Sequence, residues 1–171
     1  VYTTNGGVDW TDATTTSVGA TTMKGVSMSD ASNGVAVGFS GQIVYTTNGG
    51  VDWTDATTTD VGATHMYGVS MIDASNGVAV GQSGQIVYTT NGGVDWTDAT
   101  TTDVGTNTMR GVSMIDANNG VAVGYRGQIV FAGSVSSDGS SDGSSDGSSD
   151  GSSDFCYDCE APKLTKVEVH I

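Results

Sequence analysis

The sequence is poor in positive charge. Its 171 residues include five lysines and arginines against 19 aspartates and glutamates, so the formal net charge at pH 7 is −14. Nucleic-acid backbones and anionic membrane surfaces are bound by clustered lysine and arginine, so we expect neither as a partner. The acidity instead favours solubility, mutual repulsion of free subunits and affinity for hard cations.

Long apolar segments and proline are also scarce. No apolar run approaches the 18 residues of a membrane-spanning helix, so we predict no membrane span. The single proline, Pro162, interrupts no expected strand. Val1 begins inside a repeat and no signal peptide precedes it, so we expect a processed form or an excerpt of a longer product. The richness in Thr, Ser, Gly, Asp and Asn predicts an extracellular or cell-surface protein of bacterial type.

What the sequence does contain is a repeat of 43 residues. Residues 1–43 and 44–86 differ at five positions, and residues 44–86 and 87–129 differ at seven. A period of this length is typical of a modular array, in which each unit buries its apolar face against its neighbour. Near-identical units disfavour an enzyme, because catalysis needs different residues in different roles.

Each repeat has the pattern of a small antiparallel sheet. Short segments rich in β-forming residues alternate with Gly- and Asn-rich turns, and no helical period is present. In the middle unit the expected strands are 66–72, 77–81, 85–90 and 94–100. Four strands in about 43 residues is the size of one β-propeller blade. We therefore predict an all-β fold of four-stranded antiparallel blades over residues 1–132.

Residues 46–53, TTNGGVDW, resemble the Asp-box, the Ser/Thr-x-Asp-x-Gly-x-Thr-Trp hairpin of sialidase-type propellers. Residues 25–50 resemble the repeats of photosystem II assembly factor-like bacterial propellers. Asn48 replaces the box Asp, and Asp52 replaces the box Thr. The resemblance implies a structural hairpin whose polar side chain caps turn amides and whose tryptophan packs between blades. The residues to which the resemblance assigns a structural role in the fold are Asn5, Gly7, Trp10, Asn48, Gly50, Trp53, Asn91, Gly93 and Trp96.

The number of blades is unusual for a propeller. Residues 23–56 and 66–99 form two whole blades, a third begins at residue 109, and the equivalent of its missing fourth strand is residues 8–14. About three blades do not close a ring, whereas propellers close with four to eight. Copies of the chain assembled around an axis, additional repeats in a longer product, or an open filament would each solve this.

A polar tract follows the repeats. Residues 133–154 contain four copies of Ser-Ser-Asp-Gly, which is typical of a flexible, charge-extended linker. The alternative is a calcium-binding tract, although the spacing of its carboxylates is not that of a known calcium loop. The candidate ligands are Asp138, Asp142, Asp146, Asp150 and Asp154.

The last segment, residues 155–171, combines a CxxC motif with a strand. In a secreted protein, Cys156 and Cys159 predict a local or intermolecular disulfide. A redox motif would need a thioredoxin-like βαβ context, which is absent, and a zinc site would need two more ligands, for which only His65 and His170 are available. The alternating pattern that follows predicts a strand with Leu164, Val167, Val169 and Ile171 as its apolar residues. It is either the first strand of another domain or a donor strand for the open sheet edge of the next subunit.

The differences between repeats are themselves organised. In a blade, the loop before the first strand and the turn after the second open onto the same face, and the variable positions fall there. These differences reflect either drift at exposed turns or a contact face for a neighbouring subunit or a glycan. The residues of that contact face are Lys24, Phe39, Tyr67, Arg110, Tyr125 and Arg126.

The functional prediction is a protein without enzymatic activity. Arg110 and Arg126 are the only arginines, too few for the arginine triad of a sialidase, and no catalytic triad can be drawn from the two histidines. Our first hypothesis is an extracellular structural subunit that self-assembles into a fibre or array through sheet edges and blade packing. The alternatives are an adhesin-like propeller that binds a glycan or protein, and a chaperone like the photosystem assembly factors. No cofactor is required, and calcium is the one ion that the acidic tract suggests.

Overall fold

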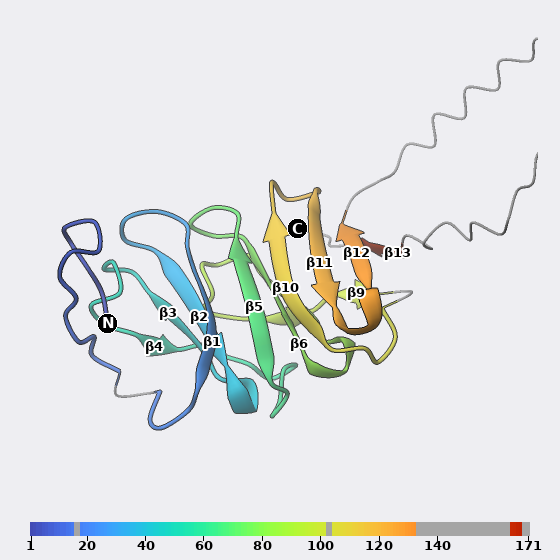
Figure 1. Cartoon of the computed structure of the whole chain (residues 1–171), viewed down its shortest axis with the longest axis horizontal. Coiled ribbons are helices and arrows are strands. Elements are labelled where there is room, and N and C mark those ends of the chain that lie inside the picture. The colour runs from blue at the N-terminus through green and yellow to red at the C-terminus, as the bar shows by residue number, and fades with distance from the viewer. Residues whose placement is uncertain (16–17, 102–103, 133–164, 169–171) are drawn as a thin grey trace, which may run out of the picture.

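The repeats fold into sheets that stand side by side (Figure 1). The computed structural model describes residues 1–15, 18–101, 104–132 and 165–168. The first sheet contains β1 (Met23–Met28), β2 (Gly34–Gly38), β3 (Ile43–Thr46) and β4 (Thr54–Asp55). The second contains β5 (Met66–Met71), β6 (Gly77–Gly81), β7 (Ile86–Thr89) and β8 (Thr97–Asp98). Both are antiparallel throughout, so the prediction of an all-β fold built from four-stranded blades is confirmed.

The third sheet begins like the others and ends differently. It contains β10 (Met109–Met114), β11 (Gly120–Gly124), β12 (Ile129–Ala132), then β13 (Thr165–Glu168) and β9 (Thr100–Thr101). The segment β13 lies parallel to β12, with Thr165 opposite Val130, and antiparallel to β9. In the other blades an antiparallel fourth strand occupies this edge. The C-terminal strand therefore pairs within its own chain, an arrangement that the sequence analysis did not consider.

The innermost strands hold the blades together. Strands β1, β5 and β10 lie next to one another, and the amide of Met71 in β5 donates to the hydroxyl of Ser27 in β1 (2.9 Å). The amide of Met114 donates in the same way to Ser70 (3.0 Å). The backbones approach closely at Gly68, where an added Cβ would lie 3.1 Å from the Cα of Gly111. These contacts explain why a glycine and a serine recur at the same places in every repeat.

The fourth strand of each blade is shorter than the sequence pattern predicts. The pattern predicted residues 94–100, whereas β8 is only Thr97–Asp98. The difference arises because Asp95 lies in the hairpin loop, where its amide donates to the side chain of Asn91 (3.0 Å) instead of to a neighbouring strand. At the N-terminus, residues 8–14 form no strand. They contribute only isolated bridges, between Tyr2 and Thr11 and between Thr14 and Asp52.

The hydrophobic core lies between the blades. The interface of the first two blades buries Val35 and Val37 from β2 against Val69 and Met71 from β5, with Trp96 in the same cluster. A second cluster repeats this arrangement between the second and third blades. Burial of this apolar surface requires a neighbouring blade, so each blade depends on the next for its stability.

Candidate partner-binding face

The hairpin between β3 and β4 is closed by its own side chains. Thr46 Oγ1 accepts hydrogen bonds from the amides of Asn48 (3.3 Å) and Gly50 (3.0 Å), and Asn48 Oδ1 accepts one from the amide of Asp52 (3.0 Å). Trp53 Nε1 donates to the carbonyl of Gly50 (3.0 Å). The same bonds recur in the hairpins of residues 3–10 and 89–96. These polar groups are satisfied within the hairpin, so they stabilise the turn.

The two departures from the Asp-box pattern compensate for each other. Asn48 keeps an oxygen that accepts from the Asp52 amide, and its Nδ2 donates to the Asp52 carboxylate (2.8 Å). An Asp at position 48 would instead place a second carboxylate against Asp52. The sequence showed both departures but did not predict that their side chains bond to each other.

A second set of side chains is placed by β-bulges. In each inner strand the register shifts at the second residue, so Lys24, Tyr67 and Arg110 are the extra, unpaired residues of three equivalent bulges. A bulge turns its side chain out of the regular alternation of the strand. The short turns η1 (Phe39–Gly41), η2 (Gln82–Gly84) and η3 (Tyr125–Gly127) follow the neighbouring strands and bring two further aromatic rings to the same side.

These side chains form a continuous series of contacts across the three blades. Lys24 Nζ lies 4.6 Å from the centroid of the Phe39 ring, and Phe39 packs edge-on against Tyr67 at 6.2 Å. The Arg110 guanidinium carbon lies 4.2 Å from the Tyr67 ring and 4.5 Å from the Tyr125 ring. Arg110 also donates to the hydroxyl of Tyr125. We call this set, with His65, the cation–aromatic face.

His65 belongs to this face although the sequence analysis did not include it. Its ring stacks on Phe39, with the centroids 4.4 Å apart, and its Nδ1 accepts from the amide of Ser40 (3.0 Å). The signal that could have found it is its variability, because Thr22 and Thr108 stand at the same place in the other repeats. Arg126, the sixth predicted contact residue, lies in η3 in the left-handed region of the backbone (φ 58°) and is exposed.

The positive charge of the repeats is concentrated here. Lys24, Arg110 and Arg126 are the only lysines and arginines among residues 1–132, and all three stand at the bulge and turn positions of this face. Eleven aspartates share the same residues. The face is therefore a local positive site on an acidic protein, and its exposed cations are available to a negatively charged partner.

Two aspartates, one in a loop and one in β8, have shifted pKa values. Asp73 accepts from the side chain of Asn76 (2.9 Å) and from the amides of Ser75 and Asn76, and these bonds lower its pKa. Desolvation, followed by the nearby charge of Asp60, raises the pKa of Asp98. Neither group lies among the residues of the cation–aromatic face.

The remaining predicted site residues fall mostly outside the described part of the chain. The acidic tract with Asp138, Asp142, Asp146, Asp150 and Asp154, the pair Cys156 and Cys159, and the strand residues Leu164, Val169 and Ile171 all lie there. Val167 is within β13, opposite Ala132. Within the described ranges no group of three or more His, Cys, Asp or Glu side chains could hold a metal ion. No helix in these ranges is long and apolar enough to cross a membrane.

The fold and this face define the class: a propeller-like repeat protein with a charged and aromatic surface along its blades. Among solved structures, the chain is similar to YCF48 bound to a D1 peptide, with a TM-score of 0.59 and 22% identity over 66% of this chain and 37% of that one. It is also similar to YCF48 from Cyanidioschyzon merolae, with a TM-score of 0.56 and 18% identity over 66% and 34% of the two chains. An ancestral GH74 enzyme matches with a TM-score of 0.51 and 12% identity over 64% and 17%.

These likenesses concern the fold. No protein-family model and no curated protein matches the sequence. The chain spans about a third of the length of the two YCF48 structures. The propeller-like architecture expected from the repeats is supported by all three neighbours.

Proposed function

We propose that this chain is a non-enzymatic binding module that holds an acidic segment of a partner protein against its cation–aromatic face. The observation that carries the proposal is the placement of the only cations of residues 1–132 on one face, interleaved with four aromatic rings. Arg110 is exposed and contacts two tyrosine rings, so the guanidinium N–H groups that do not bond to Tyr125 can donate to a carboxylate.

The comparison with YCF48 supports a protein partner. One of the similar structures is described as bound to a D1 peptide, so a propeller of this kind binds a polypeptide segment in that case. By this analogy the chain acts like the photosystem assembly factors, as a chaperone or adaptor for another protein. A glycan is the alternative ligand, because aromatic rings beside cations suit sugars as well as peptides.

A binding experiment tests this proposal. Two labelled peptides of equal length, one rich in Asp and Glu and the other with Asn and Gln in their place, are titrated with the protein and followed by fluorescence anisotropy. We expect binding of the acidic peptide, weakened at least about tenfold by Arg110→Ala and weakened by salt. Lys166→Ala, in β13, is the charge-matched control. Equal binding of both peptides, or no effect of Arg110→Ala, contradicts the proposal.

The second candidate function is that of a self-assembling structural subunit, located outside the cell. It is favoured by apolar side chains left exposed on both outer blades. On the first blade Val26 and Met28 are exposed, whereas the equivalent Val69 and Met71 of the second blade are buried. Exposed apolar faces at both ends of a stack favour association with further blades. An adhesin role and a calcium requirement of the acidic tract are further predictions for an extracellular protein.

A further inference from the structure

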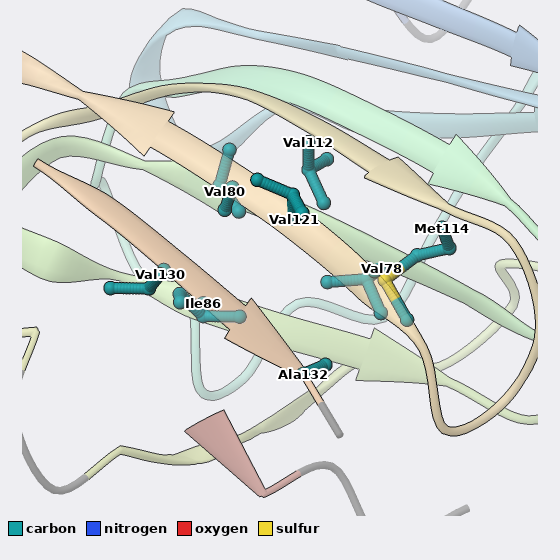
Figure 2. Close-up of a pocket in the computed structure, with 10 residues that line it drawn as sticks. Val78, Val80, Ile86, Val112, Met114, Val121, Val130 and Ala132 are labelled. Atoms are coloured by element: carbon teal, nitrogen blue, oxygen red, sulfur yellow. The ribbon is translucent and has the colours of Figure 1, made fainter. Parts of the chain in front are cut away.

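An apolar pocket lies between the second and third blades (Figure 2). The hollow has a volume of about 270 Å³, part of which is open to solvent. One side comes from the second blade, with Val78, Val80 and Ile86, and the other from the third. The lining residues of the third blade are Val112, Met114, Gly120, Val121, Ala122, Val130 and Ala132.

The equivalent place between the first two blades shows which side chain is missing from this pocket. Shifted back by 43 residues, Val78 becomes Val35 and Val130 becomes Val87, which pack together between the first two blades. There Trp96, from the hairpin that follows β7, is part of the same cluster. After β12 the sequence departs from the repeat, and position 139, the equivalent of Trp96, is a glycine. The pocket is therefore the place of a missing Asp-box tryptophan.

The chain carries another hairpin of the required kind, at residues 3–10. Residues 3–10 have the sequence of residues 89–96 and the same internal hydrogen bonds. Trp96 is 3% exposed, whereas Trp10 at the tip of the N-terminal hairpin is 60% exposed. The chain therefore has an exposed tryptophan on a formed hairpin and an apolar pocket whose Val78 and Val130 correspond to residues that pack with Trp96.

We propose that the pocket between the second and third blades binds the N-terminal Asp-box hairpin of a second copy of this chain, with Trp10 as the anchor. The same docking would stack the first blade of one copy on the third blade of the other. It would cover Val26 and Met28 on one side, and Val121, Val123 and Ile129, all exposed, on the other. Their equivalents are buried at the interface of the first two blades, and at the second interface they are buried except for the half-buried Val112 and Met114.

The hydrogen bonding of Gln128 is consistent with the docking of the N-terminal hairpin in this pocket. In the second blade Gln85 Nε2 donates to Asp98 in the fourth strand, and in the first blade Gln42 does the same to Asp55 (2.6 Å). Among the described residues the equivalent Gln128 has no carboxylate partner, and its Nε2 donates instead to the carbonyl of Val104 (2.8 Å). In the docked pair, Asp12 of the second copy would take the place of Asp98.

The strand β13 competes for part of this site. It lies along β12, where the hairpin of the second copy would add its fourth strand. Docking therefore displaces β13 from β12, so a change that weakens β13 should promote association. Two copies joined in this way supply about six blades, within the range in which propellers close, and repeated docking without closure gives a filament. This gives the self-assembling candidate function a mechanism, and it does not depend on what the cation–aromatic face binds.

Sedimentation velocity over a concentration series tests the proposal with the full chain. We expect the wild type to associate, and Trp10→Ala to weaken association on the order of 100-fold or more. Val167→Pro removes an amide from the centre of β13 and should strengthen association. Ala132→Phe blocks the mouth of the pocket and should leave that copy monomeric. Circular dichroism and the melting temperature establish that each variant is folded.

A mixing experiment distinguishes specific docking of the hairpin from nonspecific association. The Trp10→Ala copy keeps an intact pocket and the Ala132→Phe copy keeps an intact hairpin, so an equal mixture should form dimers although each alone does not. A mixture that stays monomeric, association that survives Trp10→Ala, or wild type and Val167→Pro that both sediment as monomers overturns the proposal. Binding of the acidic peptide is measured in the same variants, and its retention in Trp10→Ala distinguishes the two proposals.

Discussion

Trp10 and Trp96 occupy the same place in two copies of one hairpin, and both donate Nε1 to the carbonyl of a glycine three residues earlier (3.0 Å). Trp10 is nevertheless 60% exposed and Trp96 3%. The hairpin forms in both cases because its hydrogen bonds are local. Burial of the indole depends on a neighbouring blade: Trp96 belongs to the cluster between the first two blades, and Trp10 belongs to none of the clusters of the described residues.

This difference predicts two very different mutational effects. Trp96→Ala should lower the free energy of unfolding by about 3–5 kcal/mol, because it leaves a cavity between the first two blades. Trp10→Ala in the monomer should cost less than about 1 kcal/mol. Urea unfolding at a protein concentration below association measures both. Equal losses for the two variants would show that the tryptophans stabilise the hairpins and not the blade interface.

The pairing of Asn48 with Asp52 predicts a coupled effect. Asn48→Asp should cost about 1–3 kcal/mol at neutral pH, because it removes the Nδ2 donor and sets two carboxylates against each other. The double change Asn48→Asp with Asp52→Thr restores the Asp-box pattern and should recover most of that loss. A double-mutant cycle by thermal unfolding measures the coupling. Additive effects of the two single changes would contradict a direct interaction between these side chains.

Asp98 and Asp60 predict a stability that depends on pH. Desolvation and then the charge of Asp60 raise the pKa of Asp98 in the folded state, so the folded state favours protonated Asp98. That contribution is present at low pH and is lost as the pH rises through this pKa. Asp60→Asn keeps an oxygen for the Asp98 amide and removes the repulsion. We expect Asp60→Asn to raise the melting temperature at pH 7. The gain in the free energy of unfolding should be less than about 1 kcal/mol, because solvent screens the pair of carboxylates.

The pH dependence of the same variant provides the check. The advantage of Asp60→Asn over the wild type should shrink as the pH falls below the pKa of Asp98, since the repulsion disappears on protonation. Melting curves from pH 7 to pH 3 measure this. A constant difference across the range would show that charge repulsion is not the cause.

The close approach of the inner strands predicts a contrast between two equivalent glycines. An added Cβ at Gly68 would lie 3.1 Å from the Cα of Gly111 and 3.2 Å from the carbonyl oxygen of Arg110, both of them backbone atoms. At Gly111 it would meet only the Val123 side chain, at 3.4 Å. Gly68→Ala should therefore cost about 1–3 kcal/mol, and Gly111→Ala distinctly less. Thermal unfolding of both variants compares the two positions; similar costs would contradict the observed strand spacing.

Much of the blade could be predicted from the sequence because its signals are local. Residues 77–81 were predicted as a strand, and β6 has those bounds because glycines punctuate a short apolar run. The repeat also predicted that Lys24, Tyr67 and Arg110 occupy equivalent places on one face, since positions 43 residues apart fall at the same point of successive blades.

Other features depend on contacts that no local pattern carries. The stacking of His65 on Phe39 joins two different repeats, and the pairing of β13 with β12 joins segments separated by the polar tract. The pocket beside Val78 could have been inferred only by asking where the equivalent of Trp96 is missing. The short fourth strands were mispredicted because the Asp95 amide bonds to a side chain instead of a strand.

The most direct test of the proposed binding face is a heteronuclear NMR titration of the full chain with the acidic peptide. The account predicts shift changes that concentrate on Lys24, Tyr67 and Arg110 and on the rings of Phe39 and Tyr125, and that disappear with Arg110→Ala. Changes confined to other surfaces, or none at concentrations at which the peptide is soluble, would contradict the assignment of this face to partner binding.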